Sequence, residues 1–328
     1  MTPGDSAGTP ISKSERSGAP ATVAERLYYS SPVLEFTATV TDIRLDSTSK
    51  NEAGEREQLW QVALDRTAFY PEGGGQPWDT GVLIATAKSG AVLEVAVERV
   101  EEDAAEEVWH YVRKPLVAGT EVVGHVDAGR RQDHEQQHSG QHLVSAMFLR
   151  EVGARTVSFH LGKESSTIDL VLREGQDRLS EGELRRVEEA ANVVVAEGRP
   201  MMSHWIEKEM ADLMLSRGDL RKVPERTWPM RIVQMQGIEF NACGGTHVGN
   251  TGAIGAVTLR RVEKVKQGWR VEFCCGLRAV RAARLDYERL SGVAKMLSVG
   301  GGDVAGRVEG LVARVKAAEK ELKGLKRG

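Results

Sequence analysis

The sequence predicts an α+β protein, with an all-β region first, a mixed region second and a helix at the end. Between residues 33 and 126, short runs rich in β-branched and aromatic residues are separated by turn-forming residues and charge clusters, which is typical of a β-barrel or β-sandwich. After residue 127, helical and strand patterns alternate, and residues 304–326 place apolar side chains at helical spacing. A chain of 328 residues is long enough for two domains.

The beginning of the chain, residues 1–30, is expected to be a disordered tail. Residues 2–21 are rich in Gly, Pro, Ser and Thr and lack the apolar core of a secretory signal. No stretch approaches the roughly 18 consecutive apolar residues that a membrane helix needs. The three cysteines include an adjacent pair and are too few for a disulfide framework. We therefore expect a cytoplasmic protein that does not span a membrane.

The all-β domain is expected to cover residues 31–126. Residues 36–40 and 93–97 are typical of its strands, because they are rich in β-branched and aromatic side chains. The polar residues 46–57 are expected to form a loop between two strands, and the acidic run 98–107 to be another surface excursion.

A second domain is expected over residues 127–285. It opens with a helix around residues 130–150, which contain no proline and can turn one apolar face inward. A second helix is expected to begin at Ser180, because Glu183 stands at the capping-box spacing, and to end at Gly198. Short strands are expected at residues 157–159, 167–172, 231–233, 254–260 and 269–273.

The last segment, residues 286–328, is expected to be helical and basic. From Thr258 to the end there are 17 Lys and Arg against 8 Asp and Glu, a balance of +9, which leaves −12 for the rest of a chain whose net charge is −3. A basic region of this kind suits a polyanionic partner such as nucleic acid. It is equally typical of a solvated helix face.

Two pairs of side chains have the spacing of metal ligands. His138 and His142 stand four positions apart on a predicted helix, and Cys243 and His247 repeat that separation around two glycines. Imidazole nitrogens together with a thiolate suit tetrahedral Zn²⁺ better than Mg²⁺ or Ca²⁺. His134 makes an equally good pair with His138, so spacing alone leaves open which histidines bind.

A third motif, residues 67–77, reads Thr-Ala-Phe-Tyr-Pro-Glu-Gly-Gly-Gly-Gln-Pro. Consecutive glycines let a backbone approach a ligand closely, but the lysine and the spacing of a phosphate-binding loop are missing. Taken in order, residues 69–77, 137–142 and 242–248 resemble the motifs of the alanyl-tRNA editing proteins. The similarity covers roughly residues 34–280.

The resemblance implies a fold and a metal site. In that family an N-terminal barrel that bears the glycine-rich motif packs against an α/β domain that holds zinc, with the active site between them. By motif position the Zn²⁺ ligands would be His138, His142, Cys243 and His247, with His134 outside the set. Four protein ligands leave no position for a water unless coordination expands, so we expect zinc to position the substrate or polarise its ester carbonyl.

The resemblance also implies a substrate, tRNA(Ala) mischarged with serine or, to a lesser degree, glycine. The substrate-binding residues that it implies are Thr67, Gly73, Gly74, Gly75 and Gln76. Thr67 would recognise the serine hydroxyl, which the alanyl ester lacks. Gln76 and His160 are the candidates for a catalytic role. His160 lies in a segment where synthetase-embedded editing domains carry a polar glutamine.

Other functions remain open at this point. A threonyl-type tRNA editing domain shares the two zinc half-motifs, and a non-catalytic tRNA-binding module would use zinc only structurally. A metallopeptidase is disfavoured, because the Glu that follows the first His of the zincin motif is replaced by Ser139. No ATP-binding motif is visible, so aminoacylation is not expected.

Overall fold

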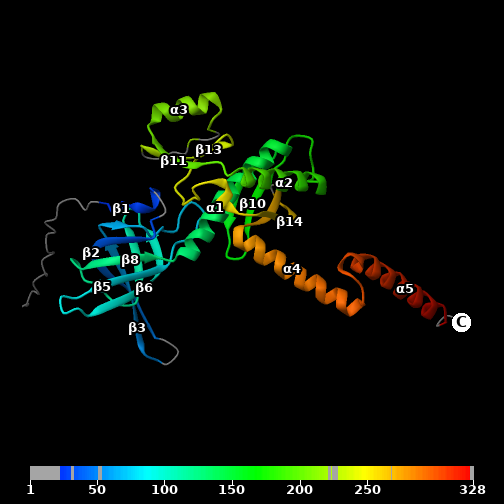
Figure 1. Ribbon diagram of the computed structural model, residues 1–328, viewed down its shortest axis with the longest axis horizontal. Helices are drawn as coiled ribbons and strands as arrows, with labels where there is room; N and C mark the ends of the chain where they lie inside the picture. The colour runs from blue at the N-terminus through cyan, green and yellow to red at the C-terminus, as the bar shows by residue number, and fades with distance from the viewer. Residues whose placement is uncertain are drawn as a thin grey trace, which may run out of the picture.

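The computed structural model describes residues 23–30, 33–50, 54–220, 223, 228–266 and 268–325. A β-barrel lies at one end, a mixed α/β region adjoins it, and two helices extend away from both (Figure 1). The predicted α+β class is therefore confirmed. Among the helices of the described residues, none is long and apolar enough to cross a lipid bilayer.

The barrel is closed and consists of antiparallel strands in the order β2-β3-β7-β6-β5-β8. Their bounds are β2 Glu35–Lys50, β3 Arg56–Leu64, β5 Gly81–Thr86, β6 Val92–Glu102, β7 Val108–Val112 and β8 Glu121–Val126. In β8, buried side chains alternate with more exposed ones, so one face of the strand fills the barrel core.

Two segments that were expected to be a loop and a surface excursion belong in part to strands. β2 continues to Lys50 and β3 begins at Arg56, so most of residues 46–57 form the arms of a long hairpin. Likewise, the acidic run 98–107 begins inside β6, which ends at Glu102. Polar residues are compatible with these strands because backbone pairing holds the ribbon while side chains remain in solvent.

The last part of the segment expected to be a tail forms defined structure. Residues 1–22 lie outside the described residues, but residues 23–30 are ordered. β1, Glu25–Arg26, pairs in parallel with β4, Arg66–Thr67, and the 3₁₀ turn η1, Leu27–Tyr29, follows. Tyr28 is buried, and its ring centroid lies 5.3 Å from that of Tyr70. Aromatic packing thus orders the end of a segment whose earlier composition suggested disorder.

The mixed region is built around α1, Ala128–Val152, which is buried on nearly all sides from His134 to Phe148. One sheet has the order β14-β15-β10-β9 and a second sheet the order β11-β12-β13. The strands are β9 Arg155–Leu161, β10 Ser166–Val171, β11 Met201–Ile206, β12 Met230–Met235, β13 Glu239–Ala242, β14 Val257–Val265 and β15 Gly268–Cys275. The other elements are α2 Glu181–Glu197, α3 Lys208–Arg217 and η2 Thr251–Ile254.

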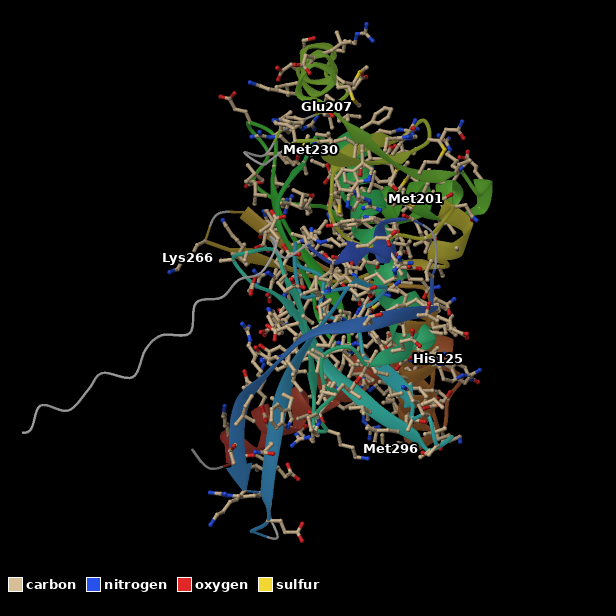
Figure 2. The ribbon with its side chains drawn as sticks, turned by 90° about the vertical axis from the view of Figure 1, so that its left-hand side faces the viewer. His125, Met201, Glu207, Met230, Lys266 and Met296 are labelled. Carbon is tan, nitrogen blue, oxygen red and sulfur yellow. The ribbon has the colours of Figure 1, made fainter. Side chains whose placement is uncertain are left out.

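The ends of α2 confirm the capping prediction. The Ser180 side chain accepts from the N–H of Glu183, the Glu183 side chain accepts from the N–H of Ser180, and the helix ends at a left-handed Gly198. In Figure 2, Met201 and Met230 mark β11 and β12, which lie at the end of the molecule opposite the tip of the β2–β3 hairpin.

The C-terminal part contains α4, Gly276–Leu297, the turn η3, Gly301–Asp303, and α5, Val304–Leu325. The expected boundary between residues 285 and 286 falls inside α4, because the helix is continuous across it. The interruption lies instead at the glycines that follow Leu297. α5 is largely exposed.

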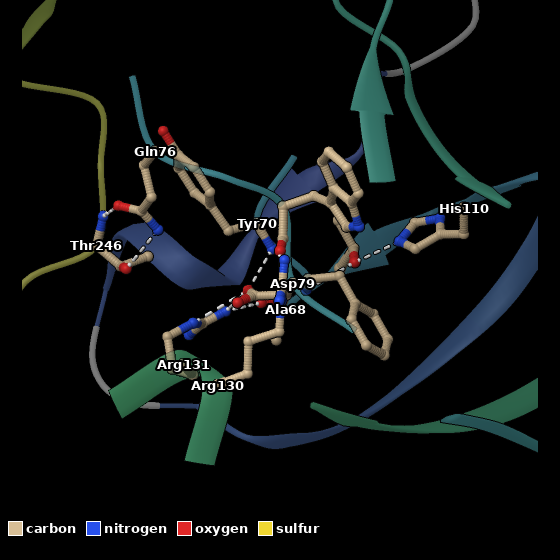
Figure 3. A network of polar contacts seen from close by, with 11 residues as sticks. Ala68, Tyr70, Gln76, Asp79, His110, Arg130, Arg131 and Thr246 are labelled. Atoms are coloured by element: carbon tan, nitrogen blue, oxygen red, sulfur yellow. Dashed lines mark hydrogen bonds and ion pairs between the residues drawn. The ribbon is translucent and has the colours of Figure 1, made fainter. Parts of the chain in front are cut away.

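A buried ion pair joins the barrel to α1 (Figure 3). The side chains of Arg131 and Asp79 are 3% and 0% exposed, and Nε of Arg131 donates to Oδ2 of Asp79 at 3.0 Å. Arg131 also donates to the backbone oxygen of Ala68 at 2.6 Å, while Oδ2 of Asp79 accepts from the N–H of Tyr70 at 2.8 Å. The segment before the glycine run is thereby fixed to the helix.

Replacing Arg131 by methionine is expected to destabilise the protein by about 3–5 kcal/mol, because it leaves the Asp79 carboxylate buried without its cation. The free energy of unfolding from urea titration would measure the loss. Arg261→Met is the control, since Arg261 and Glu263 form an exposed pair, which is worth roughly 0–1 kcal/mol. Equal effects of the two substitutions would contradict a structural role for the buried pair.

Candidate metal site

The side chains of His138, His142, Cys243 and His247 converge on one point, and their ligand atoms all lie within 4.8 Å of one another. Sγ of Cys243 lies 3.4 Å from Nε2 of His138 and 3.3 Å from Nε2 of His247. The first two histidines stand one turn apart on α1, and the other pair lies in the loop between β13 and η2. The structure thus brings together the four residues that the resemblance implied as ligands.

The chemistry of these side chains fits a metal ion such as zinc. Burial alone would raise the pKa of the Cys243 thiol, but the imidazoles of His138 and His247 hold it well below its usual range. Burial lowers the pKa of His247 to about 3, so this ring is neutral near pH 7. Burial alone would also lower the pKa of His142, but Cys243 and Glu239 raise it to about 10, so a bound ion would have to displace the proton of this ring. Thiolate and neutral imidazole are the forms in which cysteine and histidine bind zinc.

The two histidines on α1 are oriented by oxygen atoms on the far side of their rings. Nδ1 of His138 lies 2.8 Å from Oε1 of Gln76, and Nδ1 of His142 lies 3.2 Å from Oε1 of Glu239. Because an amide oxygen accepts hydrogen bonds, the contact with Gln76 places the ring hydrogen of His138 on Nδ1. Nδ1 of His142 also lies 2.9 Å from Nδ2 of Asn241, so Glu239 and Asn241 together fix the orientation of this ring. The Nε2 lone pairs are left for an ion, as in most protein zinc sites.

His247 is held in a similar way from the middle of α1. Its Nδ1 lies 3.1 Å from Oγ of Ser139, and the same oxygen accepts from the backbone N–H of Val248 at 3.1 Å. Ser139 therefore fixes both the ring of His247 and the backbone that follows it.

Gln76 joins the barrel to both halves of the cluster. It is 1% exposed, and its Oε1 accepts from His138. Oε1 also accepts from the N–H of Thr246 at 3.1 Å, and Nε2 donates to Oγ1 of Thr246 at 2.9 Å (Figure 3). Gly245 permits this approach, because a Cβ there would lie 2.9 Å from Oε1 of Gln76 and 2.2 Å from Cε1 of His138. The amide of Gln76 is therefore engaged by the protein itself.

The loop that carries Cys243 is held from another side by Arg231 on β12. Its Nη1 donates to the backbone oxygens of Cys243 and Gly245, both at 2.9 Å. The side chain is buried, and the N–H of Gly245 lies 3.4 Å from Sγ of Cys243. These bonds give the short loop a fixed backbone at the sulfur ligand.

The glycine run forms a tight turn that ends at Gln76. Gly73 and Gln76 exchange backbone hydrogen bonds of 3.1 and 2.9 Å. Between them, Gly74 and Gly75 have φ angles of +56° and +81°, which side-chain-bearing residues rarely adopt. The N–H groups of Gly73 and Gln76 are thus used within the turn, which limits the backbone left for a ligand.

Thr67, at the end of β4, is fully buried. Its Oγ1 lies 2.8 Å from Nε2 of His110 and accepts from the N–H of Phe69 at 3.1 Å. Burial lowers the pKa of His110 to about 4, so the ring is neutral, and its Nδ1 lies 3.0 Å from the backbone oxygen of Val62. Since that oxygen only accepts, Nδ1 carries the hydrogen and the Thr67 hydroxyl donates to Nε2.

The two remaining histidines of the sequence analysis lie outside the cluster. His160 on β9 is exposed, whereas the ring of its neighbour Phe159 lies 5.7 Å from that of His138. Alternation along the strand thus turns Phe159 towards the cluster and His160 away from it. His134 is buried, burial lowers its pKa to about 4, and it lines a neighbouring cavity.

Several residues around the site were not singled out from the sequence. Ser139 and Thr246 are direct sequence neighbours of the proposed ligands His138 and His247. This adjacency could have indicated that they support the site. Glu239 reaches His142 from 97 residues away, and Arg231 precedes its loop by a whole hairpin, so nothing in their local sequence indicates these contacts.

Comparison with known proteins agrees with the geometry. The family described as class II (A) tRNA synthetases matches residues 9–130, and the second additional domain of threonyl and alanyl tRNA synthetases matches residues 230–272. An alanine–tRNA ligase of Pyrococcus furiosus is 32% identical over 92% of this chain but 31% of its own length. The chain thus spans about a third of the length of such ligases.

Smaller relatives match over more of their length. The alanyl-tRNA editing protein AlaX-L of Pyrococcus horikoshii is 32% identical over 79% of this chain and 59% of its own length. The alanyl-tRNA editing protein AlaX-M of Methanosarcina acetivorans is 36% identical over 65% of this chain and 87% of its own length. Because it is 36% identical to AlaX-M over 87% of that protein's length, this chain belongs to the family of AlaX-like alanyl-tRNA editing proteins.

Proposed function

We propose that this chain is a zinc-dependent trans-editing hydrolase that deacylates tRNA(Ala) mischarged with serine and, to a lesser degree, with glycine. The observation that carries the proposal is the convergence of three imidazoles and one thiol beside Gln76 of the glycine turn. The names of the AlaX-L and AlaX-M relatives support alanyl-tRNA editing as the activity.

His138, His142, Cys243 and His247 would hold the ion, and Glu239, Ser139 and Gln76 would orient the three imidazoles. Bound zinc would supply a positive charge that orients the aminoacyl group or polarises its ester carbonyl. Burial of the ligands beneath Phe159 and the glycine turn strengthens such charge interactions, since little water screens them.

The reaction is hydrolysis of an ester. The oxygen of water adds to the carbonyl carbon, the bond from that carbon to the ribose oxygen breaks, and the ribose oxygen takes up a proton. Of the two catalytic candidates, we assign Gln76 a positioning role, because its amide oxygen already serves His138 and Thr246. His160 stands on the face of β9 away from the cluster, which argues against direct contact with the ester.

A basic cavity near the site supports a polyanionic substrate. Its volume is about 560 Å³, and it lies between Pro77, the first turns of α1 and the start of α4. Its charged lining consists of four cations and two carboxylates, namely Arg130, Lys163, Arg278, Arg281, Asp127 and Asp133. Arg278 is paired with Asp133, whereas Lys163 and Arg281 are exposed. Cations in this place suit the phosphates of a tRNA acceptor end.

Selection of serine is assigned to Thr67. With its hydrogen donated to His110 and one lone pair used by Phe69, the hydroxyl retains one lone pair that could accept from a serine hydroxyl. An alanyl methyl group offers no such donor. Since Thr67 is fully buried, contact with substrate requires that the residues covering it shift.

The activity is tested by deacylation of Ser-, Gly- and Ala-tRNA(Ala), with and without a chelator. Ser-tRNA(Ala) should be hydrolysed fastest, Ala-tRNA(Ala) should be spared, and metal removal should abolish turnover. Released radiolabelled amino acid measures the rate. tRNA binding with no turnover of any ester would favour a non-catalytic binding module, and preference for Ser-tRNA(Thr) would favour a threonyl-type editing domain.

Cys243→Ala is expected to lose the metal, because three imidazoles alone hold zinc less tightly than they do with a thiolate. Metal content of the purified variant, by mass spectrometry, should fall well below about one ion per chain. The control is Cys274→Ala, since Cys274 is a buried cysteine outside the cluster. Unchanged metal content in Cys243→Ala would refute its assignment as a ligand.

Thr67→Val keeps the shape of the side chain and removes the hydroxyl. The kcat/KM for Ser-tRNA(Ala) should fall by roughly 10- to 100-fold, whereas that for Gly-tRNA(Ala) should change much less, because glycine has no hydroxyl to lose. Thr67→Ser, which retains the hydroxyl, should keep most of the serine preference. Equal losses on both substrates in Thr67→Val would indicate a purely structural role.

A further inference from the structure

Trp205 is an exposed aromatic residue on β11, the edge strand of the β11-β12-β13 sheet. Its side chain is 54% exposed, and its ring centroid lies 5.4 Å from that of Tyr29 at an interplanar angle of 79°. A tryptophan exposed to this extent on an edge strand is costly in water and is typical of a contact surface.

Trp205 is connected to the metal loop through the neighbouring strand. It is the direct cross-strand partner of Arg231, so both side chains stand on the same face of the sheet. The guanidinium carbon of Arg231 lies 5.2 Å from the centre of the Tyr29 ring. The same guanidinium donates to the backbone at Cys243 and Gly245. Three contacts, through Tyr29 and Arg231, therefore lead from the exposed indole to the backbone of the sulfur ligand.

A row of four aromatic rings, which we call the aromatic row, runs from Trp205 to the glycine turn through the tyrosines Tyr29, Tyr28 and Tyr70. The Tyr29 ring lies 4.6 Å from that of Tyr28, whose ring lies 5.3 Å from that of Tyr70. The Tyr70 hydroxyl donates to the backbone oxygen of Gly73 at 3.0 Å. Tyr70 and Tyr28 are buried, Tyr29 is partly exposed and Trp205 is the most exposed, so the row opens to solvent at Trp205.

We propose that Trp205, backed by Tyr29, stacks on the unpaired 3′-terminal base of the tRNA while the aminoacyl ester of the same nucleotide lies at the metal cluster. The inference rests on the proposed function. In every aminoacyl-tRNA, the amino acid is bonded to the ribose of the 3′-terminal nucleotide. A site that binds the ester must therefore have the base close by.

Stacking on an aromatic ring is the usual way in which proteins hold an unpaired base. A pocket for an apolar peptide would be a different use of this face. The base is favoured because Trp205 stands on the face that carries Arg231, whose guanidinium supports the metal loop. Arg231 also makes a cation–π contact with the Tyr29 ring, which holds this ring beside Trp205.

The test compares two hairpin RNAs that copy the acceptor stem, one ending in CCA and the other with an abasic 3′-terminal nucleotide. Fluorescence anisotropy with the full chain gives their dissociation constants. Trp205→Leu should weaken binding of the CCA hairpin by roughly tenfold, and Trp205→Phe much less. Neither should weaken binding of the abasic hairpin. Leucine retains apolar packing on Tyr29, so the difference between Leu and Phe isolates the aromatic ring.

Tyr287→Ala is the matched control, because Tyr287 is 62% exposed and lies beside Arg284 at 5.6 Å, but on α4. It should leave binding of both hairpins unchanged. Equal weakening of both hairpins by Trp205→Leu, or no weakening of either, would overturn the inference. If Ser-tRNA(Ala) is nevertheless hydrolysed, only the base site fails. If the unaltered chain neither binds the hairpins nor hydrolyses the ester, the proposed function fails as well.

Discussion

The buried ion pair between Asp79 and Arg131 sets the geometry on which the metal cluster depends. Asp79 follows Gln76 by three residues, and Arg131 precedes His138 by seven, or about two helical turns. Fixing these two side chains to each other fixes the glycine turn against α1. Only then can Oε1 of Gln76 reach Nδ1 of His138 at 2.8 Å. The barrel therefore does more than carry the turn, because it supplies a partner that orients a proposed metal ligand.

The hydrogen bonds around the cluster make the junction and the metal loop a single network. Gln76 accepts from His138 on α1 and from Thr246 in the loop, while Ser139 on α1 contacts both His247 and Val248. A change in any of these residues would disturb two elements at once. Such a network holds its side chains in place before an ion binds, which lowers the entropy lost on coordination.

The sequence predicted those parts of the structure that depend on nearby residues. The capping box at Ser180 and the spacing of His138 and His142 are local, and both are found as expected. The outer parts of the β2–β3 hairpin were expected to be a loop between two strands, because their polar residues are stabilised by backbone pairing rather than by burial. The positions of His160 and Phe159 depend on strand register, and a shift of one residue exchanges the two faces. Contacts such as Glu239 with His142 arise only in the tertiary fold.

The aromatic row and the enclosed Thr67 point to how binding and selection would cooperate. Thr67 is fully buried, so its remaining lone pair becomes available only if the residues that cover it shift. That shift must be driven by interactions made elsewhere with the substrate. Tyr70 hydrogen-bonds Gly73 of the turn, and through Tyr28 and Tyr29 it is in contact with Trp205, where the terminal base is proposed to stack. Binding energy gained at a part of the tRNA common to all esters could thus open the site, leaving the Thr67 hydroxyl to separate serine from alanine.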